Sequence, residues 1–114
     1  MTLTGLTSEF SYDILIYGSR GNNGGTNVFT VTDGNGTSSQ NTDAFENSAD
    51  VASFTSLAAD GSGEITIVFE TTGGPNGSNE GALGVMQITA TSIPEPSVVL
   101  LGALGGLSLL RRRR

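Results

Sequence analysis

Residues 10–18 read FSYDILIYG, and apolar or aromatic side chains recur at every second position of this stretch. The side chains on one face of an extended chain would be Phe10, Tyr12, Ile14 and Ile16. Because successive side chains of a strand point to opposite faces, this period of two predicts a β-strand. Leu15 and Tyr17 make the second face partly apolar as well, which is typical of a central strand in a β-sandwich.

Four further stretches are rich in β-branched and aromatic residues and also predict strands. They are residues 27–32 (NVFTVT), 51–57 (VASFTSL), 64–70 (EITIVFE) and 82–91 (ALGVMQITAT). The third has the clearest alternation, with Ile65, Ile67 and Phe69 on one face.

The last of these stretches closes the predicted sheet region. We expect Leu83 and Val85 to point inward, with Ile88 as a further inward candidate. Residues 37–50 show little pattern beyond Phe45, and we expect a long loop or a poorly formed strand there. Residues 1–6 are expected to be a loop that enters a strand.

Gly- and Asn-rich connections separate the predicted strands at residues 21–25, 33–36, 60–63 and 73–77. Gly and Asn tolerate positive φ, and Asp and Asn side chains bond the local backbone, so these clusters favour turns. Short strands with such turns predict an all-β fold, an antiparallel β-sandwich or jelly-roll-like body followed by one short hydrophobic helix. Five strands are fewer than the about eight of a jelly roll, so we also expect the sandwich to be incomplete.

Charge divides the chain into two parts. Residues 1–96 hold all 11 acidic residues and a single base, Arg20, for a net charge of −10, whereas the last four residues are arginines. A body of this charge repels phosphate backbones, so no nucleic acid is expected as a partner. The chain has no Cys, His or Lys, which excludes disulfides, thiolate or imidazole metal ligands, Schiff bases and P-loops.

The C-terminal segment, residues 93–114, has three parts in order. Pro94, Glu95 and Pro96 come first, an uncharged apolar run follows, and Arg111, Arg112, Arg113 and Arg114 end the chain. The apolar run is Val98, Val99, Leu100, Leu101, Gly102, Ala103, Leu104, Gly105, Gly106, Leu107, Ser108, Leu109 and Leu110. Together with Ser97 it would span roughly 21 Å as a helix, against a hydrocarbon core of roughly 30 Å, a mismatch that arginine snorkelling and local thinning reduce.

This order of parts resembles the PEP-CTERM sorting signal of Gram-negative bacteria, over the 22 residues from 93 to 114. The resemblance implies that a membrane-embedded exosortase recognises the segment and cleaves near the Pro-Glu-Pro motif. It implies a precursor held transiently in the cytoplasmic membrane with residues 1–92 outside the cytoplasm. The mature form would lie at the cell surface or in the extracellular polysaccharide matrix. The positive-inside rule agrees with this orientation.

Alternatives for the tail are a simple C-terminal anchor and a buried core helix, although a core helix would not normally end in four arginines. Gly102 and Gly106 form a Gly-x-x-x-Gly pair that would let another helix approach, but such a pair also arises easily in a Gly-rich segment. Export needs a signal peptide, and residues 1–10 contain neither a basic region nor an apolar run. We therefore expect the body to be N-terminally truncated.

Arg20 is the one cation of the body and lies beside a Gly/Asn loop. It could contact a ligand such as a sugar hydroxyl or a uronate carboxylate through its planar donor fork. The alternative, which the excess of acidic residues favours, is an ion pair that holds the loop.

The acidic residues of the loops suggest a calcium site as one possibility to consider. Asp33, Asn35 and Thr37 are spaced like EF-hand ligands, but Ser38 and Ala44 stand where that loop needs Gly and Glu, so the EF-hand is excluded. A shallower calcium site at Asp33, or at Asp43, Glu46 and Asp50, is the alternative to a solvated turn. No cofactor is otherwise expected.

No enzyme activity is expected, because no serine has an imidazole or lysine to activate it and no two carboxylates are marked as facing each other. The main hypothesis is a non-enzymatic structural or adhesive protein of the surface or matrix. The alternative is a carbohydrate-binding β-sandwich module, the C-terminal fragment of a larger secreted enzyme. The body also resembles the C-terminal half of jelly-roll domains of exported proteins at residues 17–20 (YGSR), 60–65 (DGSGEI) and 83–88 (LGVMQI). This resemblance implies a fold and an association with polysaccharide.

Overall fold

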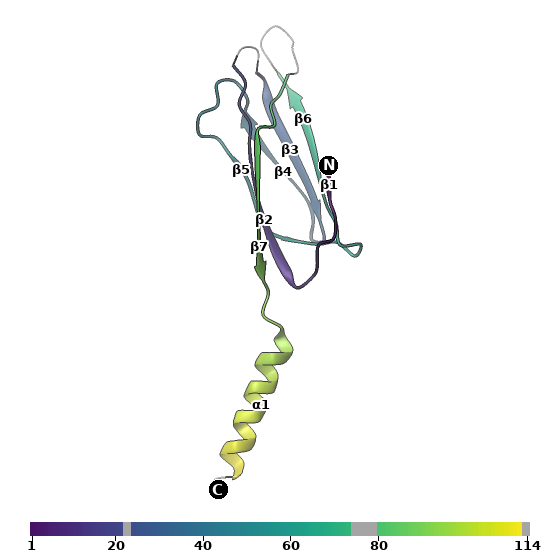
Figure 1. Ribbon diagram of the computed structural model, residues 1–114, viewed down its shortest axis with the longest axis vertical. Coiled ribbons are helices and arrows are strands. Elements are labelled where there is room, and N and C mark those ends of the chain that lie inside the picture. The colour runs from purple at the N-terminus through teal and green to yellow at the C-terminus, as the bar shows by residue number, and fades with distance from the viewer. Residues whose placement is uncertain (22–23, 74–79, 113–114) are drawn as a thin grey trace.

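The computed structural model describes residues 1–21, 24–73 and 80–112, and the side chains of all of these except 97–99. The described residues form seven strands and one helix (Figure 1). Their bounds are β1 (Thr2–Leu3), β2 (Phe10–Tyr17), β3 (Thr26–Asp33), β4 (Gly36–Asp43), β5 (Ala52–Ala58), β6 (Ile65–Thr72), β7 (Val85–Ser92) and α1 (Pro96–Arg112).

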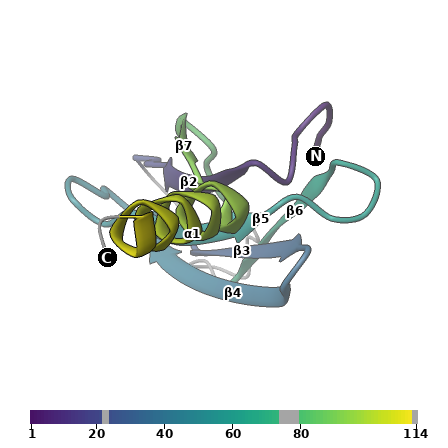
Figure 2. The same ribbon diagram turned by 90° about the horizontal axis from the view of Figure 1, so that it is seen from below.

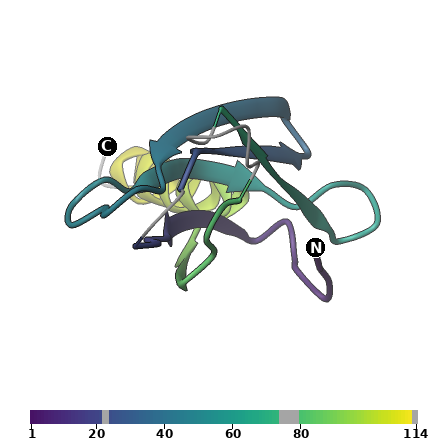
Figure 3. The ribbon, with the colours of Figure 1, turned by 90° about the horizontal axis from the view of Figure 1, so that it is seen from above.

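The strands make two antiparallel sheets with the orders β1-β6-β3-β4 and β5-β2-β7. Figures 2 and 3 look along the long axis of the molecule from its two ends and show the sheets as facing layers. β2 lies between β5 and β7, so the prediction of a central strand at residues 10–17 is confirmed, as is the antiparallel sandwich with a C-terminal helix.

The core lies between the two sheets and is built from alternate residues of four strands. Its buried members are Tyr12, Ile14 and Ile16 of β2, Phe29 and Val31 of β3, Ala52, Phe54 and Leu57 of β5, and Ile65 and Ile67 of β6. The inward faces predicted for β2 and β6 are therefore confirmed, although Phe69 at the far end of β6 is 38% exposed. Phe69 stacks on the buried Phe29, with ring centroids 5.2 Å apart.

The prediction of a loop or poor strand at residues 37–50 is wrong for its first half. Gly36–Asp43 is a complete strand, β4, that pairs with β3 at eight positions. A hairpin turn creates this pairing: the backbone N–H and the side-chain amide of Asn35 both donate to the Asp33 carboxylate, at 3.1 and 3.2 Å. Only Thr42 of β4 is buried, so the strand carries no apolar pattern. Its backbone bonds to β3 form it instead.

The predicted inward position of Val85 is also wrong. Val85 is 64% exposed and lies opposite Tyr17. Met86 is instead the inward residue opposite the buried Ile16. β7 begins at Val85 rather than at residue 82, and a shift of one residue moves every side chain of a strand to the other face. Ile88 does lie on the inner face, opposite Ile14, yet it is 44% exposed.

The N-terminal residues differ from their predicted structure, whereas the turns that the structure describes agree with theirs. Residues 2–3 form β1 on the edge of β6 rather than a loop. The predicted turns at 33–36 and 60–63 are confirmed, the second by Asp60, whose carboxylate accepts the N–H groups of Ser62 and Glu64. The predicted turn residues 22–23 and 74–77 lie outside the described residues.

Candidate functional site

The end of the sandwich away from α1 is tied together by backbone hydrogen bonds between segments far apart in sequence. We call this region the loop end and define it as residues 17–21, 24–26, 41–50 and 80–82. The Arg20 N–H donates to the Ala44 carbonyl at 2.8 Å, and the Glu46 N–H donates to the Arg20 carbonyl at 2.8 Å. Gly25 continues the chain of contacts, since its N–H donates to the Glu80 carbonyl at 3.0 Å. The loop end is thus a defined scaffold that can present side chains.

Arg20 makes an ion pair with Glu80, Nη2 to Oε2, at 2.7 Å. The ion-pair alternative from the sequence is therefore confirmed. The two side chains are 45% and 46% exposed, so solvent screens much of the attraction and the pair contributes little to stability. The ion pair nevertheless engages the guanidinium group of Arg20, the one basic residue of residues 1–96.

Asn47 organises the loop that follows β4, although no pattern in the sequence pointed to it. Its Nδ2 donates to the carbonyls of Gly18 at 3.1 Å and Asp50 at 2.7 Å, and its Oδ1 accepts the N–H groups of Ala49 and Asp50. The Tyr17 hydroxyl donates to the Asn47 carbonyl. The residue is only 9% exposed. An Asn followed by Ser is a turn signal, but nothing local marks it as buried.

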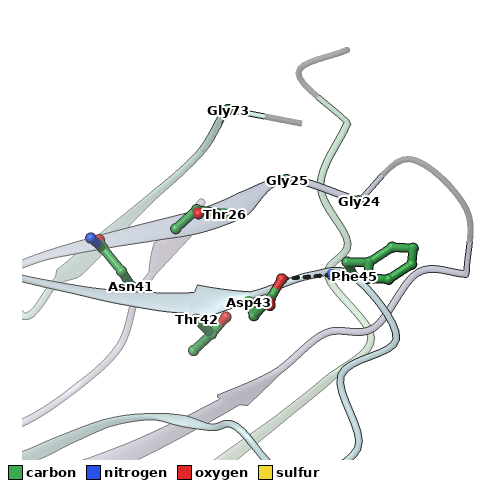
Figure 4. Close-up of a pocket in the computed structure, with 8 residues that line it drawn as sticks. All are labelled: Gly24, Gly25, Thr26, Asn41, Thr42, Asp43, Phe45 and Gly73. Carbon is green, nitrogen blue, oxygen red and sulfur yellow. Dashed lines mark hydrogen bonds between the residues drawn. The ribbon is translucent and has the colours of Figure 1, made fainter. Parts of the chain in front are cut away.

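An open groove of about 640 Å³ lies on the loop end (Figure 4). Its lining residues are Gly24, Gly25, Thr26, Asn41, Thr42, Asp43, Phe45 and Gly73. Figure 4 shows the Phe45 ring at one end of the groove and the Asn41 amide at the other. Phe45 is 43% exposed. The groove therefore offers one aromatic face beside amide, hydroxyl and carboxylate groups.

Three of the acidic residues considered for calcium have structural partners. Asp43 Oδ1 accepts the Phe45 N–H at 2.9 Å, and Asp50 Oδ2 accepts the Asp43 N–H at 3.0 Å. Asp33 binds its own turn and also accepts the Ala58 N–H at 2.8 Å. Across residues 1–21, 24–73 and 80–112, no group of three or more acidic residues gathers in a way that could hold a metal ion. Hydrogen bonds to the local backbone thus account for three of the four carboxylates considered for calcium, those of Asp33, Asp43 and Asp50.

The Pro-Glu-Pro motif lies at the start of α1. Pro96 is the first residue of the helix, a position where the missing N–H of proline costs no hydrogen bond. The helix therefore extends beyond the expected apolar run, from Pro96 to Arg112. Arg111 and Arg112 form its last turn, where positive charge complements the helix dipole. Arg113 and Arg114 lie outside the described residues.

α1 points away from the sandwich, and the molecule is 80 Å long as a result (Figure 1). Its leucines, which are Leu100, Leu101, Leu104, Leu107, Leu109 and Leu110, are 54% to 69% exposed. Gly102 and Gly106 have open space where a Cβ would lie. The alternative of a buried core helix is therefore wrong. The expected run Val98 to Leu110 is helical as predicted, but within the described part of the chain no helix is both long and apolar enough to cross a membrane.

Comparison of the chain with protein-family models, with curated proteins and with solved structures finds no match.

Proposed function

We propose that the chain is an exported, non-enzymatic surface or matrix protein whose residues 93–114 are a sorting signal for an exosortase. One observation carries the proposal. The Pro-Glu-Pro motif and the exposed apolar helix, with Arg111 and Arg112 in its last turn, form a unit that projects from the sandwich and leaves its leucines uncovered. Exposed leucines over the whole length of a helix favour an apolar environment, because burying them removes apolar area from water.

The apolar composition of α1 supports transient residence in the cytoplasmic membrane, although the helix is shorter than the membrane is thick. Its 17 residues extend about 26 Å at 1.5 Å per residue, and they include Arg111 and Arg112, so the apolar part falls short of the roughly 30 Å of a hydrocarbon core. Arg111 and Arg112 can reach the phosphates by snorkelling, which reduces the mismatch. Cleavage after Ile93 would leave an acidic body with ten acidic residues and Arg20, a net charge of −9.

Processing by an exosortase is tested by expressing the chain behind a signal peptide in a host with the enzyme and in an isogenic host without it. Mass spectrometry of the C-terminus should show loss of Arg114 only in the first host. Replacing Pro94, Glu95 and Pro96 together by alanine should abolish the cleavage, whereas Thr91→Ala, an exposed change in β7, should leave it intact. Secreted protein that retains Arg114 in the exosortase-positive host would contradict the proposal.

A second candidate function, carbohydrate binding, is favoured by Phe45. An aromatic side chain that is 43% exposed at the end of a groove is suited to pack against the apolar face of a sugar ring. Asn41, Thr26 and Asp43 supply hydrogen-bonding groups beside it. This reading makes the extracellular polysaccharide the partner of the body.

Binding to polysaccharide is tested by titrating the full chain in detergent with acidic and neutral exopolysaccharide oligomers. Phe45→Ala should weaken binding by roughly tenfold or more, while Phe45→Trp should retain it. Val51→Ala is the matched control, since Val51 is equally exposed at 42% but does not line the groove. Equal binding by Phe45→Ala and the unchanged chain would exclude this groove as the site.

A further inference from the structure

The groove at the loop end lies in negatively charged surroundings. Asp43 is the one charged residue among its described lining residues. The loop end as a whole holds four acidic residues and one base, for a net charge of −3; these are Asp43, Glu46, Asp50, Glu80 and Arg20. Residues 22–23 and 74–79 contain no charged side chain, so they leave this balance unchanged. A ligand in the groove therefore meets a negative potential.

The base of the loop end is not placed to receive an anionic ligand in the groove. Arg20 is held by Glu80 at 2.7 Å, and it is not among the described residues that line the groove. An acidic sugar would therefore bring its carboxylate towards Asp43 without a lining cation to offset the repulsion between like charges. The charges of the groove thus oppose a uronate and favour a cationic group.

Asp43 and Phe45 are held in a fixed relation by the residue between them. Ala44 is completely buried, and both of its backbone groups are bonded. Its N–H donates to the Gly25 carbonyl at 2.9 Å, and its carbonyl accepts the Arg20 N–H at 2.8 Å. The two flanking side chains therefore line the groove from a segment of backbone that is already ordered, which lowers the entropy lost when a ligand binds.

A carboxylate and an aromatic ring are thus neighbours in the groove (Figure 4). Asp43 Oδ1 accepts the Phe45 N–H at 2.9 Å, which holds the carboxylate close to the base of the Phe45 side chain. The face of an aromatic ring is the negative part of its quadrupole, so it attracts a cation as well. Both side chains therefore favour a ligand that combines positive charge with an apolar face.

We propose that the groove binds an amino sugar, with its free ammonium group at Asp43 and the apolar face of its ring on Phe45. This inference rests on the carbohydrate-binding function proposed for the groove and names the class of sugar. The Asn41 amide and the Thr26 hydroxyl line the same groove and can bond the hydroxyl groups of the sugar. The partner of the body is accordingly a polysaccharide with free amino groups, and not a polyuronate.

Three sugar hexamers test this assignment by calorimetric titration of the full chain in uncharged detergent: those of glucosamine, N-acetylglucosamine and galacturonic acid. The first two differ in whether the amino group is free or acetylated, and the pH is kept low enough to protonate the free amine. Salt at about 0.15 M screens distant charges. The glucosamine hexamer should bind roughly fivefold or more tightly than the acetylated one. The galacturonic acid hexamer should bind most weakly.

Three variants locate the contact. Asp43→Asn should remove the preference for glucosamine, because the neutral amide keeps the shape of the side chain and its oxygen can still accept the Phe45 N–H. Glu9→Gln is the matched control, since it removes one charge from an exposed residue outside the groove, and it should keep the preference. Phe45→Ala should weaken the binding of both the glucosamine and the N-acetylglucosamine hexamers.

Equal binding of the glucosamine and N-acetylglucosamine hexamers, each weakened by Phe45→Ala, would overturn the choice of an amino sugar while carbohydrate binding by the groove stood. An equal loss of preference in Asp43→Asn and Glu9→Gln would assign the preference to the acidic body as a whole, and would also overturn it. Hexalysine carries ammonium groups without a sugar ring, and tighter, Phe45-dependent binding of this peptide would make a basic peptide the ligand instead. If the binding of no hexamer depends on Phe45, the carbohydrate function and this inference fail together.

Discussion

Gln40 of β4 and Ser53 of β5 bond each other in both directions. The Ser53 N–H donates to Gln40 Oε1 at 2.8 Å, and Gln40 Nε2 donates to the Ser53 carbonyl. The side-chain amide thus takes the place that the peptide group of a neighbouring strand would occupy. It joins the edge strands of two different sheets and closes one side of the sandwich.

Gln40→Ala should lower the free energy of unfolding by about 1–3 kcal/mol, because two hydrogen bonds are lost at a net value of roughly 0.5–1.5 kcal/mol each. Urea denaturation followed by circular dichroism measures the change. Ser38→Ala, on the same strand with an exposed side chain, is the control and should shift the midpoint very little. A Gln40→Ala midpoint equal to that of the control would show that the contact does not stabilise the fold.

Ser56 should respond to substitution through its backbone conformation. It has φ +56° and sits in a bulge of β5, where its N–H donates to Asp13 Oδ1 at 2.8 Å. Glycine adopts this region without steric cost, so Ser56→Gly should keep or raise stability by up to about 1 kcal/mol. The β-branched Ser56→Val should lower it by about 1–2 kcal/mol. Thr55→Val at the exposed neighbour, which has no positive φ, serves as the comparison. Equal effects of the two valine variants would contradict the strain argument.

Asn47→Ala should destabilise the loop end by about 2–3 kcal/mol, since the variant leaves buried backbone groups without partners. The affected groups include the carbonyl of Gly18 and the N–H of Asp50. Hydrogen exchange should show faster exchange of the Asp50 amide. Ser48→Ala, an exposed change one residue away, should leave both stability and exchange unaltered. If Ser48→Ala lowers stability as much as Asn47→Ala does, the loss of stability comes from any change in the loop and not from the loss of the Asn47 side-chain amide.

The Arg20–Glu80 pair should be worth less than about 1 kcal/mol, because both side chains are about half exposed. A double-mutant cycle with Arg20→Ala and Glu80→Ala measures the coupling, which should shrink further in 1 M salt. A coupling energy above about 1 kcal/mol, or one that does not change with salt, would contradict this prediction and would indicate an ion pair shielded from solvent.

Gly18→Ala should lower the free energy of unfolding by about 1–3 kcal/mol, as expected when a side chain is added where there is no room for it. A Cβ at this buried position would collide with the Ala82 carbonyl. Gly21→Ala is the matched control: Gly21 is exposed and has nothing within 4 Å of its Cβ position. Thermal unfolding of the two variants should differ by several degrees, and coincident melting curves would contradict the close approach.

Local pattern predicted the parts of the fold that have a buried face. β2 and β6 alternate clearly, and their inward residues Ile14, Ile16, Ile65 and Ile67 are all buried. β4 escaped prediction because it is an edge strand of polar residues formed by backbone pairing after a tight turn. In β7 the inward residue is Met86 rather than Val85. The residues before the strand are held by long-range contacts, since the Ala82 N–H donates to Asn27 Oδ1 and the Gly84 N–H donates to the Tyr17 carbonyl.

The candidate sites, too, were predictable from the sequence only in part. The ion-pair alternative for Arg20 could be anticipated from composition, but its partner Glu80 lies 60 positions along the chain. The groove beside Phe45 unites residues of β3 and β4 with Gly73 after β6. Their association depends on strand order, which no local pattern contains.

The sequence by itself determined the fold class, the central strand, the acidic body and the order of motif, apolar run and arginines in the tail. These follow from the periodicity and composition of neighbouring residues, which are local properties of the chain. Only the tertiary structure decided that Gln40 joins β4 to β5 on one side of the sandwich, while no described residue pairs with the outer edge of β7. Which backbone groups find partners depends on contacts between segments distant in sequence, and those contacts form only when the two sheets pack together.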